Sequence, residues 1–177
     1  MIENVLIVDV ETTGLHPSRG SVMIELGALL YNVHHRTVIQ TLASFFPSKT
    51  NEARHINLID PEWTTAKMDS ELFLDTFVNM ALSASAIVAH NAQFDREFLR
   101  ANIVPQHDFW RIPWVCTKKD FKWPVRLSRQ RLQDVCVAMG VPYVDAHRSL
   151  TDCQFIADCF TQVVDLHLRL SQLINSY

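Results

Sequence analysis

Two carboxylates, Asp9 and Glu11, lie at the end of the most apolar run of the sequence, which begins at Val5. Side chains two positions apart on a strand point to the same face, so a strand here would set these carboxylates side by side. Such a pair is repulsive and costly to bury unless one group is protonated or cations lie between them. Hard oxygen ligands select Mg²⁺, Mn²⁺ or Ca²⁺ rather than zinc. The pair indicates a hard-cation site, or else a strand that simply ends in solvent.

Two further polar segments carry acids and histidines. In the first, His90 and Asn91 end a short apolar run, and Asp95 falls in the first turn of the helix predicted to follow. In the second, His147 stands five residues before Asp152, a separation of about 140° on an ideal helix. We therefore expect His147 on a loop and Asp152 in the first turns of the next helix. Taken alone, each segment also fits an ordinary helix cap with an acid that compensates the dipole.

Together these segments resemble the DEDDh family of 3′–5′ exonucleases, which is related to bacterial polymerase proofreading subunits, ribonuclease T and exonuclease X. The resemblance is carried by Asp-x-Glu-Thr-Thr-Gly at 9–14, His-Asn-x-x-Phe-Asp at 90–95 and His-x-x-x-x-Asp at 147–152. The resemblance spans residues 5–160, and the residues around the motifs are most similar to those of the exonuclease X branch. A sister subfamily has a tyrosine four residues before the last aspartate. Arg148 stands there in this chain, so the histidine version applies.

The resemblance implies an RNase H-like fold and two Mg²⁺ or Mn²⁺ ions in one active site. Asp9 would bridge both ions, Glu11 and Asp152 would complete one side, and Asp95 would hold the second ion. His147 stands where the family keeps its general base. The positions that match the segment seating the terminal nucleotide are Thr12, Thr13, Gly14 and Leu15. Asn91 matches a motif position, and a cap at the start of the helix is an equally good reading of it.

The strands and helices that the sequence predicts around these residues indicate an α/β fold, with a mixed five-stranded sheet flanked by helices. Apolar, β-branched runs predict strands near residues 5–10, 22–33, 37–46, 86–89 and 114–116, the first three as an antiparallel meander. Residues 48–68 have no clear period and predict loop and short helical turns. At 177 residues we expect a single domain, residues 1–177.

Apolar residues at helical spacing predict four helices. The first begins near Asp69 or Ser70, and the second follows Asn91. The third is capped by Ser128 and stops before Gly140. The last runs from about residue 150 toward 173, with an inward stripe formed by Cys153, Ala157, Phe160, Val164 and Leu168.

Composition and charge exclude several classes of protein. With 48% hydrophobic and 20% charged residues the chain is globular, and its net charge of −3 excludes nucleic-acid binding by bulk positive charge. No apolar run approaches the roughly 18 residues of a membrane span, so we expect no membrane association. The four glycines form neither a Rossmann nor a P-loop motif. The four cysteines show no metal-ligand spacing, which favours reduced, mostly buried thiols in a cytoplasmic protein.

A basic stretch, residues 118–131, lies between the second and third motifs. Phe121 and Trp123 are interleaved with its cations, which are Lys118, Lys119, Lys122, Arg126, Arg129 and Arg131. Aromatic rings in such a stretch can stack on bases regardless of sequence, and the cations would then hold the strand backbone. A solvated loop is an equally good interpretation.

These observations predict a metal-dependent 3′–5′ exonuclease that releases nucleoside 5′-monophosphates from single-stranded or frayed 3′ ends of DNA. An RNA-trimming enzyme of the same mechanism is the nearest alternative, and a noncatalytic module that binds a polymerase or another partner is a more distant one. Any polymerase or repair partner is expected to be a separate polypeptide, and the oligomeric state cannot be read. One departure concerns residues 54–75, where relatives often show His-Gly-Ile-Thr and this chain has Arg54-His55-Ile56-Asn57. This departure concerns the substrate-facing edge of the predicted active site and not its metal centre.

Overall fold

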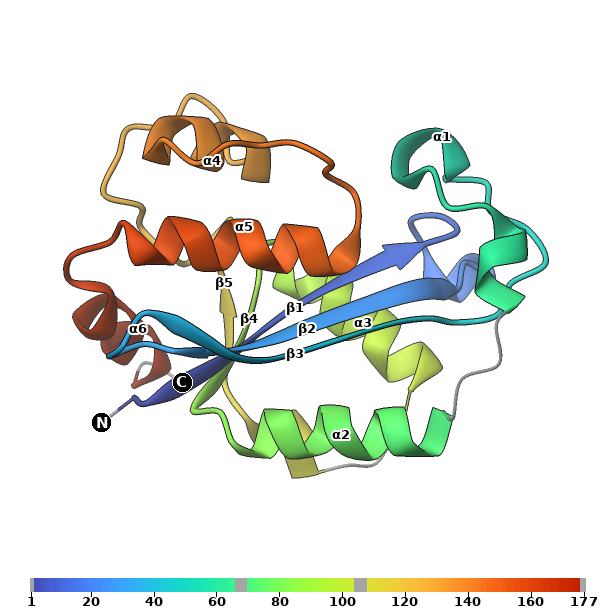
Figure 1. Ribbon diagram of the computed structural model, residues 1–177, viewed down its shortest axis with the longest axis horizontal. Helices are drawn as coiled ribbons and strands as arrows, with labels where there is room; N and C mark the ends of the chain where they lie inside the picture. The colour runs from blue at the N-terminus through green and yellow to red at the C-terminus, as the bar shows by residue number, and fades with distance from the viewer. Residues whose placement is uncertain (1, 66–69, 104–107, 176–177) are drawn as a thin grey trace.

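The centre of the molecule is a five-stranded sheet in the order β3-β2-β1-β4-β5 (Figure 1). The structure, a computed structural model, describes residues 2–65, 70–103 and 108–175. Its strands are β1 (Asn4–Thr12), β2 (Met23–Asn32), β3 (Thr37–Phe45), β4 (Ala86–Ala89) and β5 (Trp114–Cys116). The first three form the predicted antiparallel meander, while β4 and β5 join parallel to β1. The predicted α/β class and mixed sheet are confirmed.

β1 runs between β2 and β4, and its side chains are buried on both faces because helices cover each face of the sheet. Val5 and Ile7 belong to one hydrophobic core, and Leu6 and Val8 to the other. This alternation follows from the two-residue period of a strand.

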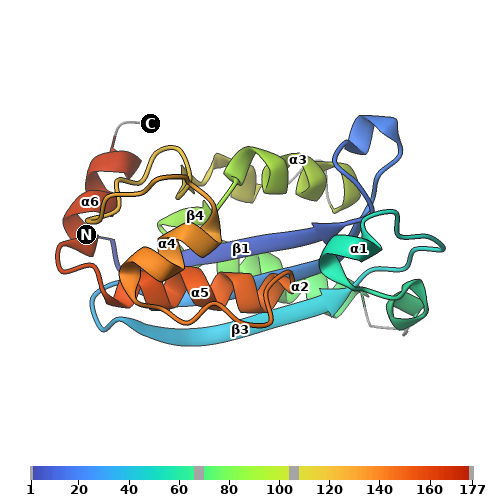
Figure 2. The same cartoon turned by 90° about the horizontal axis from the view of Figure 1, so that it is seen from above.

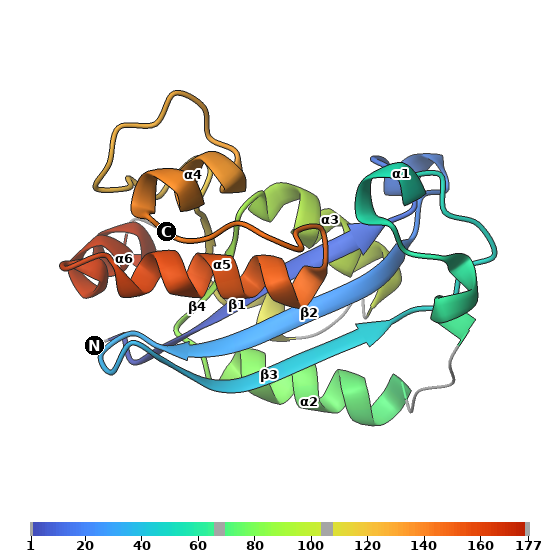
Figure 3. The ribbon, with the colours of Figure 1, turned by 45° about the horizontal axis from the view of Figure 1, so that its top comes forward.

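Helices cover the two faces of the sheet in two layers (Figures 2 and 3). The face that carries Val5 and Ile7 packs against α4 (Leu132–Met139), α5 (Ser149–Thr161) and α6 (Leu166–Ile174). The opposite face packs against α2 (Ser70–Leu82) and α3 (Ala92–Asn102). Within the described ranges, no helix is both long and apolar enough to cross a membrane.

α5 lies unusually close to the sheet because Gly27 has no side chain. A Cβ at Gly27 would lie 2.5 Å from the backbone nitrogen of Leu150. Gly27 pairs with Asp9 across β1 and β2, and the Cys153 thiol lies 3.5 Å from the Gly27 carbonyl oxygen. The first turn of α5 therefore rests on the sheet at the position of Asp9.

The short elements are η1 (Pro17–Arg19), α1 (Arg54–Asn57), η2 (Pro61–Thr65) and η3 (Asp108–Arg111). α1 and η2 are the helical turns predicted for residues 48–68, and they gather near the end of β1 (Figure 1). The side chain of Asn57, at the end of α1, donates a hydrogen bond to the Thr12 carbonyl oxygen at 3.2 Å. Asp69, one of the two predicted caps of α2, lies outside the described residues.

The prediction of one long C-terminal helix is wrong. The chain turns between α5 and α6, where Val163 becomes fully buried and Val164 is 86% exposed. Leu166 and Leu170 then face the core, whereas Leu168 of the predicted stripe points to solvent. Val163, Leu166 and Leu170 continue the helical spacing of the buried residues Ile156 and Cys159 of α5, so the periodicity gives no sign of the turn.

The prediction that the third helix begins at Ser128 is also wrong. α4 begins at Leu132, with Arg131 at the N-cap position. The Arg131 guanidinium pairs with Asp134 in the first turn at 2.9 Å, so an ion pair stabilises the helix start.

Candidate active site

The residues of the three motifs converge on one hollow of about 510 Å³. Asp9 and Glu11 reach it from the end of β1, Asp95 from the first turn of α3, and Asp152 from the first turn of α5. We call this the acidic hollow, and its other lining residues are Val10, Leu15, His90, Asn91, Phe94, Lys118, Arg131, Leu132, Gln133, Tyr143 and His147. The sequence segments 9–14, 90–95 and 147–152, which are far apart in the chain, therefore each contribute residues to one site.

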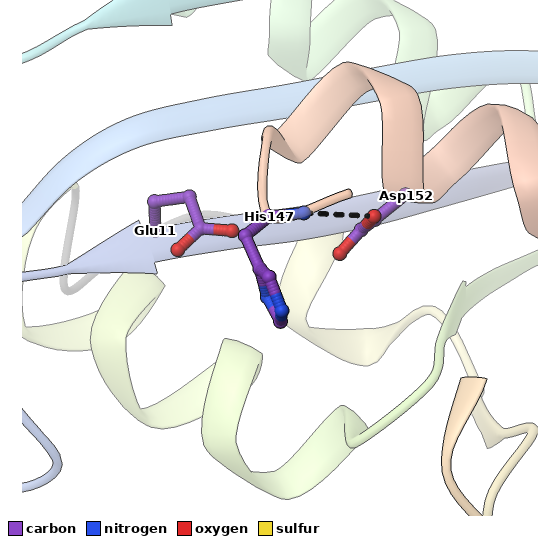
Figure 4. Close-up of side chains that lie close together, drawn as sticks. All are labelled: Glu11, His147 and Asp152. Carbon is purple, nitrogen blue, oxygen red and sulfur yellow. Dashed lines mark hydrogen bonds between the residues drawn. The ribbon is translucent and has the colours of Figure 1, made fainter. Parts of the chain in front are cut away.

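Three of these residues form a tight group, shown in Figure 4. One ligand atom each from Glu11, His147 and Asp152 lies within 4.8 Å of the others. His147 stands on the loop before α5 with a positive φ of 65°, and its backbone N–H donates to Asp152 Oδ1 at 3.3 Å. The predicted placement of His147 on the loop and Asp152 in the helix is confirmed.

Asp9 and Asp95 line the acidic hollow but, within the described part of the chain, they do not join that 4.8 Å group. Asp95 is buried, and its Oδ1 accepts a hydrogen bond from the backbone N–H of Val10 at 3.2 Å. This bond ties the start of α3 to β1 between the two carboxylates of the first motif.

Burial and mutual repulsion raise the pKa of all four carboxyl groups. Burial raises the pKa of Glu11 to about 8, with repulsion from Asp152 next in size. Burial likewise raises the pKa of Asp95 to about 7 and that of Asp152 to about 6, and the nearby His147 opposes the rise at Asp152. The pKa of Asp9 is raised well above its ordinary value by burial and then by Asp95. Crowded hard oxygen donors that repel each other fit divalent cations such as Mg²⁺, Mn²⁺ or Ca²⁺.

A fifth acid, Glu25, was missed by the sequence reasoning. It pairs with Glu11 across β1 and β2, and its buried carboxylate accepts hydrogen bonds from Arg148 at 2.7 Å and from the Ser149 backbone N–H at 3.0 Å. Glu25 thus joins β2 to the residues that directly follow His147. The signal was present, because Glu25 is the one acid within the apolar run of β2.

Asn57 is a second residue that the sequence reasoning left without a role. It is buried and donates to the Thr12 carbonyl oxygen, and a side-chain hydrogen bond to Glu11 lowers the pKa of that carboxyl group. The atypical segment at residues 54–57 therefore contributes an amide that orients the first motif. No pattern in the sequence links Asn57 to Glu11, because 45 residues separate Asn57 from Thr12.

The residues predicted to seat the terminal nucleotide are Thr12, the last residue of β1, and the first residues of the loop that follows it. The Thr12 hydroxyl donates to the Gly14 carbonyl oxygen at 2.7 Å, and the Thr13 hydroxyl accepts from the Val22 N–H at 3.0 Å. Both threonines are buried and build the loop, while Leu15 is 70% exposed at the rim of the acidic hollow. Asn91 stands at the N-cap position of α3 but makes no side-chain capping bond.

The basic stretch does not offer aromatic rings for base stacking, so that part of the prediction is wrong. Phe121 and Trp123 are buried and pack on Phe160, with ring centroids 5.2 and 5.7 Å apart. A mixed run of lysines and aromatics does not reveal which rings are needed by the core. Lys118, by contrast, is exposed and lines the acidic hollow.

The sequence matches the exonuclease family over residues 6–160. It is 31% identical over 174 residues to the PolC-type DNA polymerase III of Thermotoga maritima, covering 93% of this chain and only 12% of that polymerase. It is 25% identical to ribonuclease T of Baumannia cicadellinicola, over 93% of this chain and 85% of the relative.

A solved structure of exonuclease X in complex with 5′ overhanging duplex DNA has the same fold. The TM-score is 0.68 at 18% identity, with 97% of this chain and 98% of that chain covered. The predicted RNase H-like fold is thereby confirmed, whereas the finer placement in the exonuclease X branch stays a prediction. With the motif acids gathered in one hollow and the family match across most of its length, the chain belongs to the DEDDh 3′–5′ exonuclease family and is an enzyme that hydrolyses nucleic acid.

Proposed function

We propose that this protein is a metal-dependent exonuclease that releases nucleoside 5′-monophosphates from single-stranded or frayed 3′ ends of DNA. The observation that carries the proposal is the convergence of four carboxylates and His147, from three separate segments, on the acidic hollow. One exonuclease domain, residues 1–177, would contain the whole site.

The four acids would hold two Mg²⁺ or Mn²⁺ ions. Asp9 would bridge both, Glu11 and Asp152 would complete one side, and Asp95 would serve the other. When bound, such ions stabilise the charge of an in-line displacement at phosphorus. The support from this chain is the raised pKa of each carboxyl group, which comes first from burial and then from mutual repulsion, because bound cations compensate buried carboxylates and relieve their repulsion.

His147 would act as the general base and accept a proton from the attacking water at a ring nitrogen. It is exposed, so water can reach it, and a ring nitrogen lies within 4.8 Å of carboxylate oxygens of Glu11 and Asp152. The hydrogen bond from its backbone to Asp152 fixes the loop that carries it.

The free 3′ end would lie against the loop after β1. Leu15, exposed at the rim, would act as a wedge between the last two bases. Because the hydroxyls of Thr12 and Thr13 are used inside the loop, these residues and Gly14 would offer backbone groups to the terminal nucleotide. Asn91 would contact the nucleotide from the start of α3, where its side chain makes no capping bond.

DNA is the proposed substrate because a PolC-type DNA polymerase is a relative. RNA is the second candidate, favoured by the similarity to ribonuclease T. We further propose a cytoplasmic enzyme, since all four cysteines are buried and unpaired, and a polymerase or repair protein as a partner.

End-labelled DNA and RNA oligomers of the same sequence, digested with Mg²⁺ and with excess chelator, test this proposal. We expect shortening of the DNA from its 3′ end only when Mg²⁺ is present. The His147→Ala variant should lose about 10²–10⁴ of the turnover and change its pH–rate profile, with metal and substrate affinity changing far less. Near-normal turnover with an unchanged pH profile would assign the base elsewhere, and faster digestion of RNA would select the second candidate.

A further inference from the structure

A second hollow, of about 250 Å³, lies beside the acidic hollow and is lined by three lysines. Its residues are Lys118, Lys119, Phe121, Lys122, Trp123, Val125, Leu127 and Gln130, and we call it the lysine hollow. All three lysines are exposed, and none of the described residues that line it is acidic. Asp120 belongs to the same turn, but its carboxylate accepts the Cys116 N–H at 3.0 Å and it lines a different hollow.

Hydrogen bonds to the carbonyl oxygens of Cys116 and Thr117 hold the backbone that carries the lysines. The Cys116 carbonyl oxygen accepts hydrogen bonds from the N–H groups of Asp120 at 2.8 Å and Phe121 at 3.1 Å. The indole N–H of Trp123 donates to the Thr117 carbonyl oxygen at 3.0 Å. The rings of Phe121 and Trp123 both belong to the hydrophobic core. The lysines therefore project from a fixed turn, which lowers the entropic cost of binding an anion there.

The lysine hollow adjoins the acidic hollow through Lys118 and His90. Lys118 lines both hollows, and its backbone N–H donates to the His90 carbonyl oxygen at 3.1 Å. The His90 ring lies 3.0 Å from the Thr117 hydroxyl and 2.9 Å from the carbonyl oxygen of Gln130, which lines the lysine hollow. A shared wall of this kind lets one extended ligand occupy both hollows.

We propose that the lysine hollow binds backbone phosphates of the strand whose 3′ end occupies the acidic hollow, an inference that rests on the proposed function. Cations that track a backbone without reading bases are typical of single-strand binding. They also answer an electrostatic need, because the chain carries a net charge of −3 and its acids crowd the neighbouring hollow. A dinucleotide would be too short to profit from this contact.

The Lys119→Gln/Lys122→Gln double variant tests the inference, and it spares Lys118, which lines the acidic hollow. The matched control is Arg36→Gln, in the β2–β3 hairpin, which lies beside the start of β1 and so at the other end of the sheet from the end of β1 (Figure 3). Binding of a fluorescent 12-mer single strand is followed by anisotropy in excess chelator, at ~50 to ~200 mM salt. Hydrolysis of a dinucleotide and of the 12-mer with Mg²⁺ is measured alongside.

If each lysine neutralises one phosphate, the double variant should lose about 1.4 from the slope of log affinity against log salt. Over this fourfold salt range, wild-type affinity should fall about sevenfold more than that of the variant. The KM for the 12-mer should rise, whereas dinucleotide hydrolysis and the Arg36→Gln control should stay near wild type. An unchanged salt slope and an unchanged preference for the 12-mer would overturn the inference. Absence of Mg²⁺-dependent hydrolysis by wild type would instead refute the proposed function, and the anisotropy slope would still report on the lysine hollow.

Discussion

Without metal, the protein should become less stable as the pH rises above neutrality. Burial raises the pKa of Glu11 to about 8 and that of Asp95 to about 7 in the folded state, against ordinary values of 4.5 and 3.8. The folded state therefore keeps protons that the unfolded state has already released, so the free energy of unfolding falls with pH until both groups are ionised. The stabilisation is fully present below the ordinary values of 3.8 and 4.5, falls as the pH rises above them, and is lost for Asp95 by about pH 7 and for Glu11 by about pH 8.

The window between about pH 6.5 and 8.5 is dominated by the buried carboxyl groups, and Asp9, whose pKa is also raised well above its ordinary value, adds to the loss in the same direction. Burial lowers the pKa of His90 to about 4, and its opposite contribution is complete above the ordinary value of 6.5. Across the window, linkage gives a loss of about 2 kcal/mol from Glu11 and about 1 kcal/mol from Asp95.

The Glu11→Gln variant removes the larger contribution and keeps an oxygen that can accept the hydrogen bond from Asn57. Urea unfolding in chelator should show a wild-type loss of at least about 3 kcal/mol across the window, and the variant should lose about 2 kcal/mol less than wild type. Glu3→Gln, an exposed site before β1, should behave as wild type. A wild-type stability that stays flat or rises with pH in chelator would refute the burial and repulsion of the carboxyl groups that support the metal assignment.

Three further predictions concern the site and its support. Asp9→Asn should stay folded by circular dichroism but lose Mg²⁺-dependent hydrolysis, and Mg²⁺ should raise its melting temperature less than that of wild type. Gly27→Ala should destabilise the protein by at least about 2 kcal/mol in urea unfolding, because the new Cβ would lie 2.5 Å from the Leu150 nitrogen; an unchanged midpoint would contradict the close contact. Glu25→Ala should cost about 3 kcal/mol by the same measurement, since it leaves Arg148 and the Ser149 N–H without their acceptor, and Glu25→Gln should recover part of that loss.

Much of the sheet could be predicted because its strands are marked by continuous apolar runs in the local sequence. The apolar run of β1 and the short run of β4 are buried on both faces, and such runs are visible without knowing their partners. Asp9, Asp95 and Asp152 could also be predicted as site residues, because each stands at the end of a strand or the start of a helix that the neighbouring sequence predicts.

What could not be predicted depends on contacts between distant segments. Glu25 acquires its role from Arg148, 123 residues away, and Asn57 from the end of β1. The turn after α5 could not be predicted, because the buried residues on its two sides keep helical spacing and periodicity does not show where the chain turns. The burial of Trp123 could not be predicted for the same reason, since its place in the core depends on contact with Phe160.

A time course on a 5′-labelled single-stranded DNA oligomer tests the central claim most directly, with the released products identified by mass spectrometry. We expect a ladder that shortens one nucleotide at a time from the 3′ end, with nucleoside 5′-monophosphates as products. The ladder should require Mg²⁺ or Mn²⁺, and a 3′-phosphate or a closed circle should block it. Internal fragments, cleavage of the circle at a comparable rate, or full digestion in excess chelator would contradict the account.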